Sequence, residues 1–170
     1  MGRAVSRRRP VVLAVSIVLL AIGAGQAVAQ RAASASPRAQ PEARADFINA
    51  RAPAAHLGIG VSVAAGTYVR LALVAAAGQA WRDGDGVAAG RVDALARFVA
   101  DPLRESRWAP YAAGGVSGMY DTAERWRGVL VGVLGVEGPS LGSVVPAIEV
   151  GFGGGTRVGA VLRRSLPGRR

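Results

Sequence analysis

The feature that most constrains the fold is a strict alternation of side-chain types over Val144–Arg164. Three glycines interrupt the pattern at positions 153–155, after which it resumes. Successive side chains of a strand point to opposite faces, so alternation broken by a glycine turn predicts a β-hairpin. The apolar face of this hairpin would consist of Val144, Pro146, Ile148, Val150, Phe152, Val158, Ala160 and Leu162.

Two kinds of sheet fit such a hairpin. In a soluble sandwich or barrel the apolar face would pack into a core. In a membrane-spanning barrel the same face would point into lipid, and the small or charged residues would line the lumen.

The rest of the chain repeats the strand pattern. Alternating or glycine-rich apolar segments cover 56–63, 69–77, 91–98, 108–120 and 126–137, and a polar glycine loop is expected at Trp81–Gly90. A helix over 91–99 remains an alternative, because that segment also has helical spacing. With the hairpin there are seven strand-like segments, and Asp46–Ala55 is the best candidate for an eighth. Spanning β-strands need about 9–11 residues, which these segments supply.

The N-terminal 29 residues have the composition of a secretory signal peptide. Four arginines precede an apolar run over Val11–Ile22, and Ala27-Val28-Ala29 fits a cleavage site. Removal of this segment, which holds four of the 21 basic residues and no acidic one, lowers the net charge from +10 to +6. The dispersed basic residues that remain, together with export, argue against nucleic-acid binding.

Composition divides the remaining chain into three parts. Residues 30–45 are rich in Ala, Pro and Arg without apolar periodicity, so a disordered tail is expected there. The barrel domain would cover 46–166, and 167–170 would form a loose tail. The chain has no cysteine, which excludes both a disulfide scaffold and a lipid anchor on a cysteine.

Three segments carry a resemblance to a known class of protein. The sequences RWAPYAAGGVSGMYD and LVGVLGVEGP, followed by the 144–164 hairpin, resemble small outer-membrane β-barrel proteins of Gram-negative-type bacteria. The resemblance implies an all-β, antiparallel up-and-down barrel of about eight strands, with outer-membrane lipid and the barrel-insertion machinery as partners. Aromatic residues at segment ends fit the girdles of such barrels. The candidate girdle residues are Trp81, Trp108, Tyr111, Tyr120 and Trp126.

Motifs for catalysis, cofactors or metals are weak throughout. Gly138-Pro139-Ser140-Leu141-Gly142 fits the spacing of a nucleophile elbow, but a strand pattern follows it where a helix is needed. Asp83-Gly84-Asp85-Gly86 lacks the terminal Glu of a calcium loop, and His56 is the single histidine. No catalytic residue, cofactor or metal site is therefore expected.

Charged residues on the faces opposite the apolar ones form the candidate functional set. If those faces line a lumen, the charges must pair there, because an unpaired charge out of water is costly. We expect an internal ion-pair network centred on Glu149 that plugs or gates the barrel. The residues are Arg70, Asp93, Arg97, Glu149, Arg157 and Arg163.

The sequence therefore predicts an outer-membrane barrel with a structural, narrow-pore or surface-interaction role and no catalytic activity. The alternative is a soluble periplasmic or secreted β-barrel or sandwich that binds a ligand or a protein partner.

Overall fold

A computed structural model describes residues 39–103, 105–122 and 125–165. The expected signal peptide, the first part of the expected disordered tail (residues 30–38) and the expected loose tail at 167–170 lie outside these residues.

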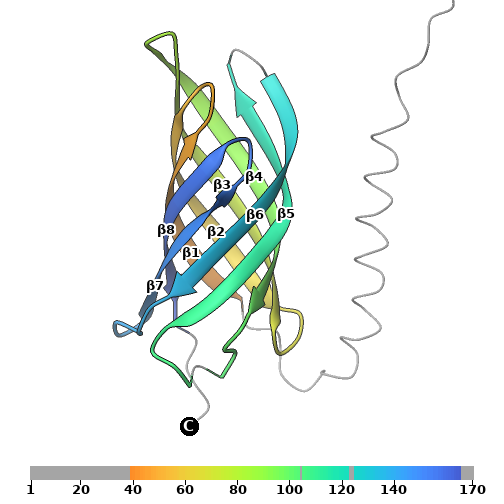
Figure 1. The fold of residues 1–170 in the computed structure, drawn as a ribbon, viewed down its shortest axis with the longest axis vertical. Coiled ribbons are helices and arrows are strands. Elements are labelled where there is room, and N and C mark those ends of the chain that lie inside the picture. Colours follow the sequence, from red (N-terminus) through yellow and green to blue (C-terminus); the bar gives the residue numbers. More distant parts are fainter. Residues whose placement is uncertain (1–38, 104, 123–124, 166–170) are drawn as a thin grey trace, which may run out of the picture. The chain divides into compact units, whose positions relative to one another are not determined.

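Eight antiparallel strands make up the described part of the chain and close into a barrel (Figure 1). Each strand pairs with its neighbours in sequence, and β1 pairs with β8, so the connectivity is up-and-down. This confirms the predicted fold class. The strands are β1 (Gln40–Asn49), β2 (Ala54–Ala64), β3 (Val69–Arg82), β4 (Asp85–Val99), β5 (Ala109–Asp121), β6 (Arg125–Glu137), β7 (Val144–Phe152) and β8 (Thr156–Arg164).

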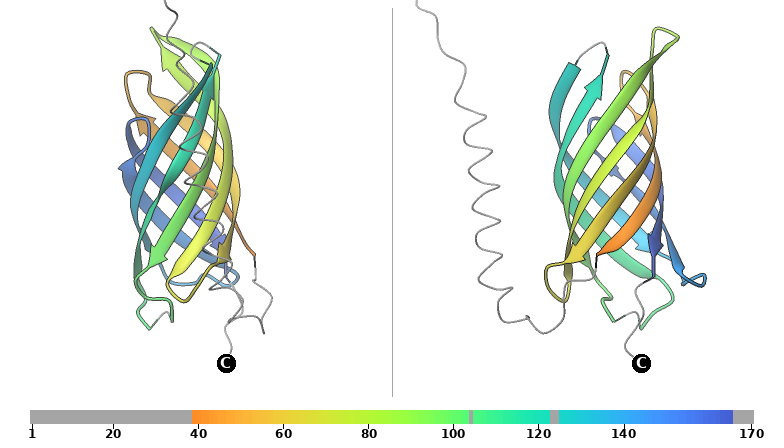
Figure 2. Two further views of the ribbon diagram at one scale, coloured as in Figure 1. Left: turned by 90° about the vertical axis from the view of Figure 1, so that its right-hand side faces the viewer. Right: turned by 180° about the vertical axis from the view of Figure 1, so that it is seen from behind.

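The barrel wall is inverted in polarity relative to a soluble protein. The apolar side chains of the β7–β8 hairpin point outward and are largely exposed, whereas Val145, Ala147 and Glu149 point inward and are buried. The same holds around the wall, whose eight strands follow one another in a closed ring (Figure 2). Among the described residues, the outward strand positions hold no acidic side chain, and their one basic side chain, Arg164, ends β8.

The first strand corrects the predicted domain boundary. Residues 40–45, expected to be disordered, form more than half of β1, and every second side chain of that strand is buried. The candidate eighth strand at Asp46–Ala55 is also wrong in extent, because β1 ends at Asn49 and β2 begins at Ala54.

The β3–β4 hairpin corrects two further expectations. The segment Trp81–Gly90 is not a loop: β3 continues to Arg82, β4 begins at Asp85, and only Asp83 and Gly84 lie between them. Both have positive φ (51° and 92°), as a two-residue hairpin turn requires. The helical alternative for 91–99 is wrong, since those residues belong to β4.

The two ends of the barrel differ. We call the end where β1 begins and β8 ends the proximal end, and the other the distal end. The proximal connections run over 65–68, 100–108 and 138–143, whereas the distal ones are 50–53, 83–84, 122–124 and 153–155. At the distal end the β3–β4 and β5–β6 hairpins rise above the β7–β8 hairpin (Figure 1).

Small apolar clusters share the lumen with charged side chains. One cluster, toward the β3–β6 side, contains Ala72, Leu95, Ala113, Val131 and Val133. The described part of the chain contains no helix long and apolar enough to cross a membrane.

Candidate functional site

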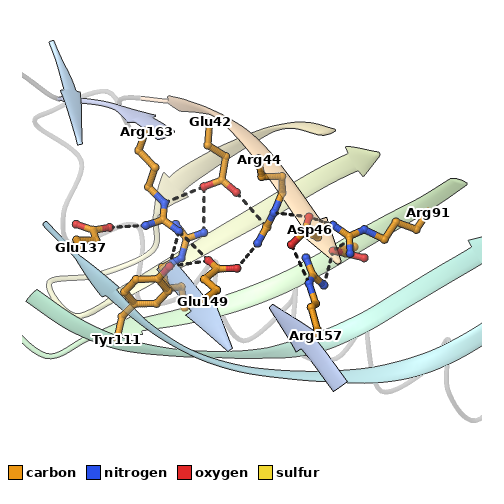
Figure 3. Close-up of polar contacts among 11 residues, drawn as sticks. Glu42, Arg44, Asp46, Arg91, Tyr111, Glu137, Glu149, Arg157 and Arg163 are labelled. Carbon is orange, nitrogen blue, oxygen red and sulfur yellow. Dashed lines mark hydrogen bonds and ion pairs between the residues drawn. The ribbon is translucent and has the colours of Figure 1, made fainter. Parts of the chain in front are cut away.

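Strand β1 supplies the centre of a buried ion-pair network in the lumen (Figure 3). Its inward positions alternate in charge: Glu42, Arg44 and Asp46 follow one another at two-residue spacing, and each is buried. Because alternate residues share one face of a strand, the three charges form a row along the lumen. Arg44 lies 3.4 Å from each of its two acidic neighbours.

Arg163 of β8 joins the proximal half of the network. Its Nε donates to Glu42 at 3.0 Å, its Nη1 to Glu137 at 2.9 Å and its Nη2 to Glu149 at 3.0 Å. Glu149 also accepts a hydrogen bond from Arg44. These contacts tie β1, β6, β7 and β8 together across the lumen.

The distal half of the network is built around Asp46 and Asp93. Arg157 donates from Nε to Asp46 at 3.0 Å and from Nη1 to Asp93 at 3.1 Å. Arg91 donates to Asp46 at 2.5 Å. Ser117 of β5 donates to the other oxygen of Asp93 at 2.6 Å. Acids and arginines therefore alternate in space from the proximal to the distal half.

Tyr111 of β5 sits inside the network. Its hydroxyl donates to Glu149 at 2.6 Å and accepts from Arg163 at 2.9 Å. Its ring lies 4.8 Å from the guanidinium of Arg163 and 5.3 Å from that of Arg97, within the range of cation–π contacts. Arg97 in turn donates to Glu42 at 3.0 Å.

Glycines across the ladder make room for these side chains. Gly159 pairs with both Asp46 and Glu149, and a Cβ on it would meet the Asp46 carboxylate. Gly135 pairs with both Tyr111 and Glu149, and a Cβ on it would overlap the tyrosine ring. At these two positions, a glycine on the neighbouring strand leaves space for a long side chain in the lumen.

Five of the six predicted lumen residues belong to this network. Asp93, Arg97, Glu149, Arg157 and Arg163 are all buried. Arg70 instead lies half-buried toward the proximal end, where it donates to Gln40 at 2.5 Å. The prediction that Glu149 is the centre is too narrow, because Glu42 and Asp46 each contact three arginines.

Several network residues were missed by the sequence reasoning. Glu42 and Arg44 fell in the segment expected to be disordered, and Asp46 began the candidate eighth strand, although the two-residue spacing of these three residues is itself a strand signal. Arg91 shares a face with Asp93 and Arg97 and could have been included on that ground. Nothing in the sequence around Glu137 indicated that its side chain belongs to the lumen network.

The aromatic residues form two groups, one toward each end of the barrel. Trp81, Tyr120 and Trp126 are partly exposed near distal strand ends, and the last two rings lie 5.5 Å apart. Trp108 is exposed just before β5 at the proximal end, where Tyr68 and Phe98 stack at 5.8 Å. The assignment of Tyr111 to this girdle is wrong, because it points inward and is only 3% exposed.

The lumen holds a buried network of ion pairs and hydrogen bonds. Arginine only donates hydrogen bonds, so a network with as many arginines as acids has an excess of donors. Nitrogens of Arg91 and Arg97 accordingly lack a hydrogen-bond partner within the described part. A cavity of about 20 Å³ near His56 and Met119 at the distal end has room for about one water. The described residues hold no cluster of three or more potential metal ligands.

Comparison with known proteins supports the fold alone. No family model matches the chain, and no curated protein is significantly similar in sequence. A solved structure, the solution NMR structure of the de novo designed TMB2.3, matches with a TM-score of 0.51 and 15% sequence identity. The match covers 80% of this chain and 99% of that chain. An eight-stranded barrel is therefore a fold that this chain shares with a designed protein.

Proposed function

We propose that the chain is a small outer-membrane β-barrel of a Gram-negative-type bacterium, with a structural role, a plugged lumen and no catalytic activity. The observation that carries the proposal is the inverted polarity of the barrel. Leucine, isoleucine, valine and phenylalanine side chains cover the outside, while five acids and five arginines pair inside. Water would penalise this arrangement, because a large contiguous apolar surface drives association.

The aromatic groups at both ends support placement in a bilayer. Membrane barrels have an apolar band about 25 Å tall between two aromatic girdles. The exposed Trp81, Tyr120 and Trp126 lie near one end of the apolar wall, and Tyr68, Phe98 and Trp108 lie near the other. Outer-membrane lipid is the partner that this surface fits. The barrel-insertion machinery is the partner expected during assembly.

The packed lumen favours a structural role over a pore. Arg97, Arg157 and Arg163 are among the largest fully buried side chains, and each is held by at least one carboxylate. An ion could pass only if several of these contacts broke together. Purified protein in planar lipid bilayers is expected to give no steady conductance, and stable channels at neutral pH would contradict the plug.

Short distal connections argue against a large recognition surface at that end. The longest of them covers four residues, 50–53, and the β3–β4 turn has two. Binding loops in barrels are longer than this, since they must present several side chains beyond the wall.

Heat-modifiable gel mobility after membrane fractionation tests the proposal. The mature chain is expected in the outer-membrane fraction, and its detergent-folded form should migrate differently from the boiled form. A mature protein that is soluble and monomeric without detergent would instead support the alternative of a soluble periplasmic or secreted barrel.

A further inference from the structure

Strand β6 has an unpaired edge at the distal end of the wall. Its register with β5 covers Arg125–Glu137, but its register with β7 begins only at Gly132, because β7 ends at Phe152. The four residues before that point, Gly128–Val131, have a strand neighbour on the β5 side alone. Figure 1 shows that the β7–β8 hairpin stops below its neighbours. We call the place above its turn, where Gly128–Val131 have no strand partner on this side, the notch.

The floor of the notch is closed by small and apolar groups. The Phe152 ring lies against Gly132 on the outer side, where a Cβ on the glycine would overlap it. On the inner side Gly154 of the β7–β8 turn lies against the sulfur of Met119, and Gly153 lies near Val131. The opening is thus bounded below by the turn and on one side by the β6 backbone.

The free edge lies at the depth of the apolar band. Trp126, which contacts Tyr120 in the distal girdle, is four residues before Leu130 on the same strand. At a rise of about 3.3 Å per residue, Leu130 lies roughly 13 Å further down the strand. Leu130 is exposed and pairs with Val116, which is also exposed. Unpaired backbone groups are costly at such a depth, because lipid offers them no hydrogen bonds.

We propose that this edge is a docking site for an extended segment of another polypeptide, which adds to β6 as a further strand. Main-chain donors and acceptors of such a segment match those of the edge, as in other cases of strand addition. Its outward side chains should be apolar, to continue the surface of Leu130 and Phe152. Its inward side chains should be small, since Met119 and Gly154 occupy the space behind the notch.

A second copy of the barrel does not fit the same edge. Two copies in one membrane orientation are related by an axis along the membrane normal. Because barrel strands tilt by about 35–45°, that operation makes two β6 edges cross instead of running side by side. The inference concerns the edge and rests on the proposed membrane placement only for its depth.

Amide hydrogen exchange of the folded barrel in detergent micelles, followed by NMR, tests the proposal. The probe is a peptide with the sequence of Leu57–Val63 (LGIGVSV), which alternates large apolar and small residues. The control is LIVVGGS, which has the same composition without the alternation. Without peptide, the notch-facing amides of Gly128–Val131 should exchange about tenfold faster or more than those of Val133–Val136. LGIGVSV should slow them and LIVVGGS should not.

Matched variants localise the effect to the edge. Leu130→Lys places a charge at the free edge, a device that blocks strand addition, whereas Leu134→Lys places it where β7 is already paired. Only the first should abolish protection by the peptide. Equal slowing by both peptides, or amides of Gly128–Val131 that are already slow in the monomer, would overturn the proposal. Protection that appears without peptide as the barrel dimerises would assign the edge to a second copy instead.

The heat-modifiability assay on the same sample separates this inference from the proposed function. A barrel that folds without detergent would reject the membrane placement, while the exchange experiment would still report on the edge.

Discussion

Removal of Glu149 should strongly disturb the proximal half of the lumen. It accepts hydrogen bonds from Arg44, Arg163 and Tyr111, and its exposed fraction is 4%. Breaking a buried ion pair by removing one partner costs about 3–5 kcal/mol, because the remaining charge stays buried. We expect Glu149→Ala to lower the free energy of unfolding by about that amount, measured by urea titration in detergent.

The neighbouring Val150 provides the control for this measurement. It lies on the same strand but points outward and makes no ionic contact. Val150→Ala should cost well under half as much as Glu149→Ala. Equal costs would mean that the lumen charges are solvated and not buried.

Two substitutions of Tyr111 separate the contribution of its hydroxyl to stability from that of its ring. Tyr111→Phe removes the group that bridges Glu149 and Arg163, at a cost of about 1–3 kcal/mol for the lost buried hydrogen bonds. Tyr111→Leu also removes the ring beneath two guanidinium groups, which should add about 0.5–2 kcal/mol. Comparing the two variants by urea unfolding gives the ring contribution. Identical stabilities would show that the cation–π contacts contribute nothing measurable.

At the scale of whole strands, the sequence predicted a strand correctly where every second residue was apolar. The β7–β8 hairpin has apolar side chains, most of them large, at alternate positions, and its bounds and turn agree with that alternation. The first half of strand β1 was not predicted, because its outward residues Ala43 and Ala45 are small and its inward residues Glu42 and Arg44 are charged. In an inverted barrel such a strand resembles a disordered segment by composition. Only the pairing of its charges with those of β4, β7 and β8 reveals its place, and that pairing is not local in sequence.

The β3–β4 turn requires a backbone conformation with positive φ, which glycine adopts without strain. Gly84 has φ of 92° and its missing Cβ would meet nothing within 4 Å, so any effect of a substitution there reports conformation and not packing. Gly84→Ala should destabilise the barrel by about 1 kcal/mol, as L-residues disfavour positive φ.

Gly66, in the β2–β3 connection, is the matched control. It also has open space around its missing Cβ, but it is not among the glycines with positive φ. Gly66→Ala should be neutral or slightly stabilising, since alanine restricts the unfolded chain. If the two variants unfold at the same urea concentration, the turn conformation does not contribute to stability.

For the molecule as a whole, the proposed membrane placement requires that the outer face of the wall meets hydrocarbon. Ile148 lies outward in the middle of β7 and is 68% exposed, while Leu141 is 67% exposed in the connection before that strand. If both side chains faced water, replacing either one with arginine would hardly change the free energy of unfolding. In a bilayer, arginine on the lipid face near the midplane costs about 2–4 kcal/mol, and the cost falls toward the interfaces.

Comparing the stabilities of Ile148→Arg and Leu141→Arg therefore tests whether the outer wall faces lipid or water. In lipid vesicles, Ile148→Arg should lower the free energy of unfolding by about 2–4 kcal/mol and Leu141→Arg by about 1 kcal/mol or less. Reversible denaturant titration followed by tryptophan fluorescence measures both, because Trp81, Trp108 and Trp126 are retained in each variant. A negligible difference between the two would mean that the side chains around Ile148 face water, and the proposed membrane placement would fail with it.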